Sequence, residues 1–300
     1  MYAPKEVGEA LLEMLRKIWN GKGIPEDWRK DVICPIYKRG DKEAVKSYRG
    51  VTLMDMAYKI YAGILDERLK VEIEDELGES QFGFRKGRGV IDAVYVLNHI
   101  IDKQLSGERG KLYVCFADLK AAFDRVNRKK LGEIMRRIGV NEKLTRRIEE
   151  IYKETKNVVR TRNHNTKEFW TVRGVRQGCL LSPTLFNIYV ARLEEEIREG
   201  QVGGIVVGER KVWSLSYADD IVLVADREEE SKEMMKRFKT FLKEVELGLS
   251  RKKTKVVVFE KRRNNRRQGK WRWGEQELEE ADEIRFLNKV FRVYTAEKWK

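Results

Sequence analysis

Cysteine, histidine and proline are scarce in this chain. Its 300 residues include three cysteines, two histidines and four prolines. Cys34, Cys115 and Cys179 are odd in number and form no C-x-x-C pair, so a disulfide framework and a zinc knuckle are both disfavoured. This usage favours an intracellular, reducing compartment. The scarcity of proline and the lack of internal repeats argue against long linkers and solenoid architectures.

Long apolar runs are also missing. No stretch of about 18 uncharged apolar residues occurs, and the first 19 residues carry charges throughout, so the sequence predicts neither a membrane span nor a secretory signal. Hydrophobic residues make up 41% of the chain and charged residues 37%. That is too hydrophobic for a disordered chain and too charged for a membrane protein, so we expect a globular fold.

Positive charge is in excess. The chain has 63 Lys and Arg against 49 Asp and Glu, a formal net charge of +14. This excess favours a polyanionic partner, either a nucleic acid or an acidic membrane surface, and charge alone does not decide between them.

Apolar residues recur at intervals of three and four in several segments, which predicts amphipathic helices. Three of these segments make the first third of the chain mainly helical, at 7–18, 57–64 and 91–101. Four more follow, at 131–138, 143–154, 185–197 and 235–245.

Short apolar runs predict strands at 112–117, 168–172, 212–216, 221–225 and 254–259. Two of them flank Tyr217-Ala218-Asp219-Asp220, so a hairpin with two acids at its tip is the simplest interpretation. The order of elements after residue 110 is typical of a split βαβ layer, in which an antiparallel sheet carries helices on one face.

Three acids are brought together by this arrangement. Asp118 closes a buried strand, and a sheet that pairs it with the hairpin would gather Asp118, Asp219 and Asp220 at one edge. Carboxylates this close repel one another unless a cation lies among them, and Mg²⁺ prefers oxygen ligands. Two such ions about 4 Å apart support phosphoryl transfer. The alternative is that Asp219 and Asp220 are ordinary turn residues that bond locally.

Longer segments decide between these interpretations. FADLKAAFD (116–124), GVRQGCLLSPTLFNIY (174–189) and YADDIVLVAD (217–226) resemble successive motifs of reverse transcriptases, in order and at suitable spacing. The resemblance is greatest to the non-long-terminal-repeat (LINE-type) retrotransposons of animals. Further segments resemble the same family at 24–54, 81–94, 248–259 and 284–291.

The resemblance implies an α+β, right-hand polymerase fold with fingers and palm and with the thumb largely absent. Helical, basic fingers are expected over 1–110 and the palm over 111–260, with a fingers insertion near 143–175. Residues 261–300 are expected to form a basic loop and a palm-to-thumb hairpin. In the primer-grip turn, where family members commonly have Leu-Gly, this chain has Leu287-Asn288. Asn tolerates positive φ, so the turn is expected to survive.

The resemblance also implies a metal site. Asp118 and Asp219 are expected to bridge two Mg²⁺ ions, for which Mn²⁺ is a substitute. The backbone carbonyl of Leu119 is a further expected ligand, and Asp220 is a weaker one. Adjacent residues of an extended segment point to opposite sides, so Asp219 and Asp220 should not ligate identically.

Other residues are implied to act on the nucleotide. Lys253 is expected to protonate the pyrophosphate leaving group, although Lys252 and Lys255 are close enough in sequence to leave the choice open. Phe123 is expected to lie beneath the incoming sugar and to exclude a 2′-hydroxyl; its alternative is a core aromatic.

A nucleotide-binding set is implied as well, in which the cations meet the triphosphate and the loop residues approach the nucleotide: Lys38, Arg39, Arg49, Gln177 and Gly178. The template-binding set interleaves a ring with cations: Phe84, Arg85, Lys86 and Arg88. The alternative for every cation in the two sets is a solvated surface charge.

The implied function is RNA-directed DNA polymerisation, with an RNA template, a DNA primer and dNTPs as partners and no membrane. An endonuclease in the same polyprotein and a nuclear site of action with a cytoplasmic phase are further expectations, and the short C-terminal part suggests a fragment of a larger polyprotein. The alternative is a truncated, inactive nucleic-acid-binding remnant. An RNA-dependent RNA polymerase is disfavoured by Ala218, where that class has Gly, and by Phe123.

Overall fold

A computed structural model describes residues 4–107, 110–162, 164–261 and 269–293. The chain forms two compact units. The first comprises Met1–Glu76 and Phe123–Ile188, and the second comprises Leu77–Ala122 and Tyr189–Lys300. In the described part of the chain no helix is both long and apolar enough to cross a membrane.

The first unit is rich in helices, as the periodicity predicts. Its α-helices are α1 (Lys5–Trp19), α2 (Met56–Ile73), α5 (Arg128–Arg137), α6 (Glu142–Tyr152) and α7 (Leu181–Val190). Short 3₁₀ helices lie at η1 (Glu26–Arg29), η2 (Val45–Ser47) and η3 (Glu74–Glu76), and the short helix α4 (Ala122–Arg125) begins the return of the chain to this unit. Side-chain oxygens of Asp55, Asn127 and Asn141 accept backbone N–H bonds at the starts of α2, α5 and α6, which satisfies donors that a helix start leaves unpaired.

The first unit also contains a four-stranded sheet in the order β2-β1-β4-β5. Its strands are β1 (Lys30–Tyr37), β2 (Tyr48–Leu53), β4 (Thr155–Val159) and β5 (Phe169–Thr171). β1 runs antiparallel to β2 and parallel to β4. The prediction of a mainly helical first third missed β1 and β2, because buried polar residues such as Asp31 and Thr52 interrupt the apolar alternation that identifies a strand.

The second unit is built on a six-stranded sheet in the order β11-β12-β10-β3-β9-β8. Its strands are β3 (Lys111–Asp118), β8 (Ser214–Tyr217), β9 (Asp220–Ala225), β10 (Lys255–Glu260), β11 (Trp271–Trp273) and β12 (Gln276–Glu280). Two separate hairpins pair β6 (Ile205–Val207) with β7 (Arg210–Val212) and β13 (Glu283–Phe286) with β14 (Lys289–Arg292). The central strands β10, β3, β9 and β8 are antiparallel, as expected.

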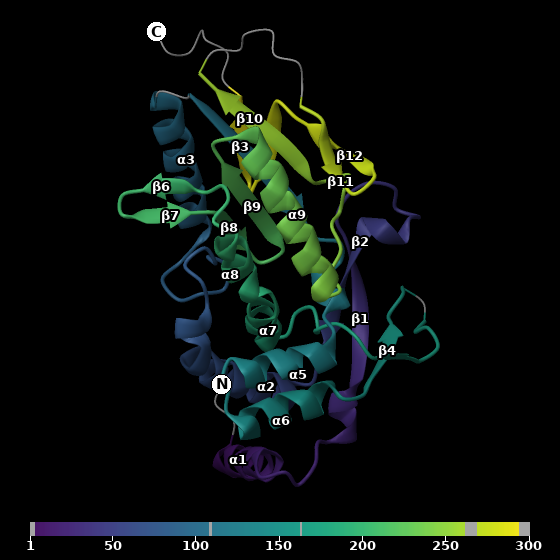
Figure 1. Cartoon of the computed structure of the whole chain (residues 1–300). Coiled ribbons are helices and arrows are strands. Elements are labelled where there is room, and N and C mark those ends of the chain that lie inside the picture. The colour runs from purple at the N-terminus through teal and green to yellow at the C-terminus, as the bar shows by residue number, and fades with distance from the viewer. Residues whose placement is uncertain (1–3, 108–109, 163, 262–268, 294–300) are drawn as a thin grey trace. The chain divides into compact units, whose positions relative to one another are not determined.

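Helices cover both faces of this sheet, where the sequence led us to expect one covered face. Residues of α3 (Val90–Ser106) share a core cluster with alternate residues of the central strands, including Val114, Val222 and Val257. The intervening residues of the same strands, such as Cys115 and Leu223, are also buried but belong to the opposite face. That face is covered by α9 (Glu228–Glu244), which crosses in front of β9 and β3 in Figure 1.

Two further boundaries differ from the predictions. The helix expected over 185–197 is found as α7 followed by α8 (Arg192–Glu199), and the intervening Ala191 keeps helical dihedral angles. The division at residue 110 is not where the units separate: α3 packs with the sheet of the second unit, and residues 123–188 return to the first. Neighbours in sequence therefore do not always share a unit.

The turn between β13 and β14 keeps its form without the family's glycine. Phe286 pairs with Lys289, and the two intervening residues, Leu287 and Asn288, have φ of 47° and 67°. Two consecutive positive φ values are the geometry of a tight two-residue hairpin turn, and Asn and Gly adopt them with least strain. Phe286 and Phe291, on the two strands, are buried in the core cluster, so the turn is coupled to the core.

We expect Asn288→Gly to stabilise the protein by about 0.5 kcal/mol, because glycine adopts positive φ without a Cβ clash. Asn288→Val should destabilise it by more than about 1 kcal/mol, because a β-branched residue is strained in this region. Urea unfolding midpoints measure both changes. Equal midpoints for Gly and Val would contradict the assigned turn geometry.

Candidate functional site

Two acids face each other where β3 ends and β9 begins. Asp118 is the last residue of β3, Asp220 is the first of β9, and the two are direct partners in the antiparallel register. Such partners have Cβ atoms about 4.5–5.5 Å apart. Asp219 lies next to them in the two-residue turn that joins β8 to β9, after Ala218 with φ of 58°. The structure therefore brings Asp118 and Asp220 together and places Asp219 beside them.

The carboxylates of Asp118 and Asp219 act electrostatically on that of Asp220. The pKa of Asp220 is raised to about 6, first by burial and then by the negative charges of Asp219 and Asp118. The positive charge of Lys253 opposes this shift. Asp219 and Asp118 are thus both close enough to Asp220 to disfavour its ionised form.

Lys253 is held at the first of these acids. Its Nζ donates to both carboxylate oxygens of Asp118, at 3.1 and 2.9 Å. The loop that carries it is tied to the end of β3, because Ser250 N–H donates to the Asp118 carbonyl and Asp118 N–H donates to Thr254 Oγ1. Of the three lysines considered from the sequence, Lys253 is the one at the aspartate; Lys255 pairs with Glu279 at 2.7 Å.

Leu119 lies where this loop meets the strand. It is buried and forms a bridge with Leu249, and the hydrogen bonds on either side use the carbonyl of Asp118 and the N–H of Lys120. Among the residues that the structure describes, no group of three or more His, Cys, Asp or Glu side chains is arranged to hold a metal ion. The ammonium of Lys253 is instead the cation that Asp118 contacts.

The segment that precedes α3 runs beside the turn that carries Asp219. Phe82 N–H donates to the Ser216 carbonyl, and Ser216 N–H donates to that of Ser80. A Cβ at Gly83 would lie 2.7 Å from the backbone nitrogen of Ala218, so only glycine permits this approach. Phe84 is 45% exposed, with its ring centroid 6.1 Å from that of Tyr217.

The predicted template cations are used partly within their own loop. Arg85 donates to the carbonyls of Leu77 and Gly78, and Arg88 pairs with the carboxylate of Glu79 at 2.7 Å. Lys86 is exposed. Arg85 and Arg88 therefore stabilise the loop that presents Phe84, a role their sequence pattern did not indicate.

In the first unit, the loop that carries Gln177 and Gly178 is docked on the chain that follows Ala122. Val175 N–H donates to the Phe123 carbonyl, and Gln177 Nε2 donates to Asp124 Oδ1 at 2.9 Å. On its other side the Gln177 carbonyl accepts from Thr52 N–H of β2. Phe123 is half-buried, and its ring stacks on Phe186 with centroids 4.8 Å apart.

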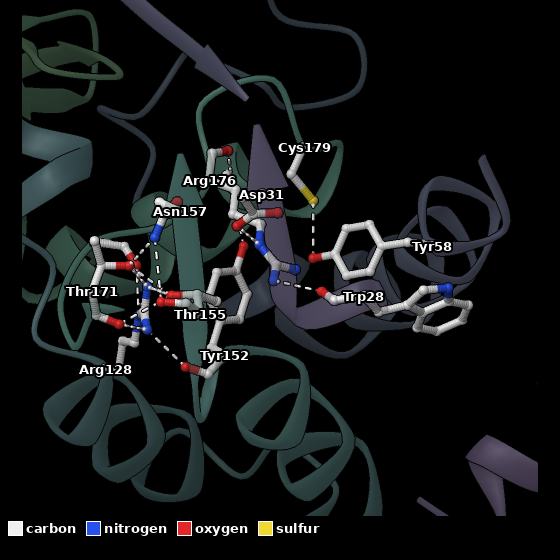
Figure 2. A network of polar contacts seen from close by, with 12 residues as sticks. Trp28, Asp31, Tyr58, Arg128, Tyr152, Thr155, Asn157, Thr171, Arg176 and Cys179 are labelled. Atoms are coloured by element: carbon white, nitrogen blue, oxygen red, sulfur yellow. Dashed lines mark hydrogen bonds and ion pairs between the residues drawn. The ribbon is translucent and has the colours of Figure 1, made fainter. Parts of the chain in front are cut away.

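A buried ion pair that no local sequence pattern predicted anchors this loop (Figure 2). Arg176 Nε donates to Asp31 Oδ2 at 2.7 Å, and each side chain is only 3% exposed. Arg176 also donates to the carbonyl of Trp28, and its guanidinium carbon lies 4.5 Å from the ring centroid of Tyr58. Burial of this pair fixes the backbone immediately before Gln177.

Arg128 extends the network to the end of the sheet (Figure 2). It donates to the carbonyls of Gly174, Tyr152 and Thr171 and to Thr155 Oγ1. Burial lowers its pKa to about 10. The only sequence signal for Arg176 was its place inside the motif at 174–189, and Arg128 gave none, because nothing in a local pattern identifies a charge whose partners are distant in sequence.

The remaining nucleotide-binding candidates lie on the β1–β2 hairpin. Lys38, Arg39 and Arg49 are exposed. Two tyrosines fix the hairpin loop: Tyr37 Oη donates to the Gly40 carbonyl at 2.6 Å and Tyr48 Oη to that of Lys42 at 2.7 Å. These three cations belong to the first unit together with Phe123, Gln177 and Gly178, whereas the acids, Lys253, Leu119 and the template candidates belong to the second.

This chain belongs to the reverse transcriptase (RNA-dependent DNA polymerase) family, whose model matches residues 36–289. The resemblance to non-long-terminal-repeat retrotransposons is confirmed by its relatives. The Pol polyprotein of the type-1 retrotransposable element R2 from Popillia japonica is 28% identical over 209 residues, which is 68% of this chain and 29% of that protein. The corresponding R2 polyprotein from Nasonia vitripennis is 27% identical over 82% of this chain and 24% of its own length.

A third relative is the probable RNA-directed DNA polymerase from transposon BS of Drosophila melanogaster, 27% identical over 67% of this chain and 22% of that protein. The chain thus spans less than a third of the length of these relatives.

Solved structures show the same fold. The apo telomerase of Candida tropicalis, truncated from its C-terminal domain, superposes with a TM-score of 0.58 at 15% identity, over 96% of this chain and 59% of that one. The telomerase of the same organism in complex with a TWJ fragment of telomeric RNA gives 0.57 at 15% identity, over 84% of this chain and 44% of that one. The expectation of an α+β polymerase fold with a mainly antiparallel sheet is therefore confirmed.

We expect Asp31→Ala to destabilise the protein by about 3–5 kcal/mol, because it leaves the charge of Arg176 buried without its partner. Asp27→Ala should cost less than about 1 kcal/mol, because Asp27 is 87% exposed and pairs only with exposed Lys30. Urea unfolding at pH 7 measures both. Equal costs would contradict an anchoring role for the buried pair.

We expect Asp220→Asn to raise the melting temperature by a few degrees at pH 7–8 in EDTA. A carboxyl whose folded-state pKa is about 6, above its ordinary value of 3.8, loses its stabilising contribution as the pH rises through that interval. The gain should therefore shrink toward zero as the pH falls from about 6 to 4. Asp102→Asn, at an exposed position of α3, is the control and should show no such dependence.

Proposed function

We propose that this chain is the polymerase core of a retrotransposon reverse transcriptase, which extends a DNA primer with dNTPs along an RNA template. The observation that carries the proposal is the direct opposition of Asp118 and Asp220, with Asp219 in the adjoining turn and Lys253 at Asp118. Opposed acids destabilise a sheet, so their presence in a family of polymerases favours a role in chemistry.

Reverse transcriptases in general use divalent metal ions. In this chain the fitting donors are the carboxylates of Asp118 and Asp219, with Asp220 and the Leu119 carbonyl in supporting positions. The set contains only oxygen and is negatively charged, which suits two Mg²⁺ ions, or Mn²⁺ in their place. Bound there, the metal would lower the pKa of the primer hydroxyl and stabilise charge on the phosphates.

Lys253 is proposed to give a proton to the pyrophosphate oxygen that leaves when the primer 3′-oxygen bonds to the α-phosphorus. Its position supports this role, because the loop bonds of Ser250 and Thr254 hold it at the acids. Contact with Asp118 holds the ammonium beside the acids until the nucleotide arrives.

The nucleotide itself is assigned to residues of the first unit. Arg49, with Lys38 and Arg39, would meet the triphosphate, and the docked loop with Gln177 and Gly178 would meet the base pair. Phe123 is proposed to exclude the 2′-hydroxyl of ribonucleotides. Its stacking on Phe186 supports this role, because a ring packed against a buried aromatic side chain cannot move in that direction away from an added oxygen.

The template strand is assigned to residues of the second unit. Phe84, beside the turn of Asp219, would contact the template together with Lys86, while Arg85 and Arg88 hold their loop. We also propose an endonuclease in the same polyprotein and a nuclear site of action. The first is supported by the R2 relatives, which are polyproteins of which this chain spans less than a third.

Primer extension tests this function. On an RNA template with dNTPs and Mg²⁺, Asp118→Asn and Asp219→Asn should each lower incorporation more than about a hundredfold, because each removes charge from the reacting centre. Asp102→Asn, matched in chemistry and exposed on α3, should retain full activity.

Two results would contradict the proposal. Incorporation of NTPs in preference to dNTPs would indicate an RNA polymerase. No incorporation by the unaltered chain with Mg²⁺ or Mn²⁺, together with salt-dependent RNA binding, would instead favour the inactive nucleic-acid-binding remnant.

A further inference from the structure

The two faces of the sheet of the first unit differ in the side chains that they bury and expose. Asp31, Thr52 and Asn157 lie on one face and are at most 8% exposed. Because side chains alternate along a strand, their neighbours point to the other face. There Leu53 is 43% exposed and Trp170 is 60% exposed. An exposed aromatic side chain is ordinary on its own, and it becomes a candidate binding feature only together with the charges around it.

Three residues form a row across the exposed face. In the strand register Lys30 of β1 is opposite Lys156 of β4, and Lys156 is opposite Trp170 of the edge strand β5. Residues opposite each other share a face, so two ammonium groups and an indole lie in line across three strands. Lys156 Nζ lies 5.6 Å from the ring centroid of Trp170.

The surroundings of this row are basic. Residues 155–173, which include the β4–β5 hairpin, contain five Lys or Arg and one Glu. Arg160, Arg162 and Lys167 are all exposed. The nearby acids only partly offset this charge: Glu168 pairs with Lys156, and Asp27 lies 3.7 Å from Lys30.

We propose that this face binds single-stranded nucleic acid, with a base stacked on Trp170 and phosphates at Lys30 and Lys156. The charge selects a polyanion, and an exposed indole beside cations suits an unpaired base, whose face is not covered by a neighbouring strand. The binding site goes beyond the proposed function, which assigns none of these three residues. The site is related to the proposed function through Arg49, a proposed triphosphate contact. Ile36 lies on the same face of β1 as Lys30, and Arg49 is opposite Ile36 in β2, so Arg49 lies on this face too.

Binding of a fluorescent 15-nucleotide RNA, and of the DNA of the same sequence, to the full chain in EDTA without dNTPs tests the proposal. Trp170→Ala should weaken binding about tenfold and Trp170→Phe much less, because stacking needs a ring and not specifically an indole. Lys30→Gln with Lys156→Gln should flatten the slope of log affinity against log salt by about 1.4, which is two phosphate contacts. Loss of affinity for both RNA and DNA, or for RNA alone, would support the proposed surface. The comparison also shows whether the surface binds single-stranded RNA only or both nucleic acids.

Matched controls separate this surface from general charge and from loss of fold. Tyr95→Ala removes an aromatic side chain that is 69% exposed on α3, and Lys5→Gln removes a charge that is 86% exposed on α1; neither should change binding beyond about twofold. Ultraviolet crosslinking of the unaltered chain should attach nucleotides within 155–173, which needs no variant to fold.

Equal affinities of Trp170→Ala and the unaltered chain, crosslinks confined to other segments, or an equal loss on duplex RNA would overturn the proposal. Because the assay contains neither divalent metal nor dNTPs, a chain that binds through Trp170 but extends no primer would refute the polymerase function and leave this surface intact.

Discussion

Mutual repulsion of carboxylates at the ends of two neighbouring strands is the constraint around which the second unit is organised. β3 and β9 are central strands with apolar side chains buried on both faces, and this burial fixes their register. Asp118 and Asp220 are therefore held opposite each other despite the repulsion between their charges. The pKa of Asp220 is raised first by burial and then by this repulsion. Lys253 offsets part of it, and the loop that positions this lysine is bonded to the same strand.

In the first unit the main structural requirement is to fix the loop at 174–178, which has no regular secondary structure of its own. Three contacts fix this loop. Arg176 forms the buried ion pair with Asp31, the Gln177 side chain donates to Asp124, and the Gln177 carbonyl accepts from the N–H of Thr52 in β2. Arg128 gathers three carbonyls from separate segments at its guanidinium. A buried arginine suits this task because its planar fork of donors bonds several backbone segments at once, where an apolar core would leave their carbonyls unsatisfied.

The sequence allowed the central sheet of the second unit, most helices and the family to be predicted, because apolar periodicity and the motifs around Asp118 and Asp219 are local signals. It did not reveal β1 and β2, whose buried face carries Asp31 and Thr52, nor the ion pair between Asp31 and Arg176, whose members are 145 residues apart. The site roles of Lys253, Phe123 and the fingers cations stay predictions. Their positions follow from the fold, but the chemistry that they perform was supplied by the resemblance.

The path of the chain through the two units bears on how such a protein can change over generations. The chain leaves the first unit after Glu76, returns at Phe123 and leaves again after Ile188, so neither body is encoded by one uninterrupted stretch. A genetic crossover between residues 77 and 188 would join halves of both bodies from different parents and disturb two cores at once. Exchange among elements of this kind is therefore expected to be rarer within this interval than outside it, where a crossover divides only one of the two bodies.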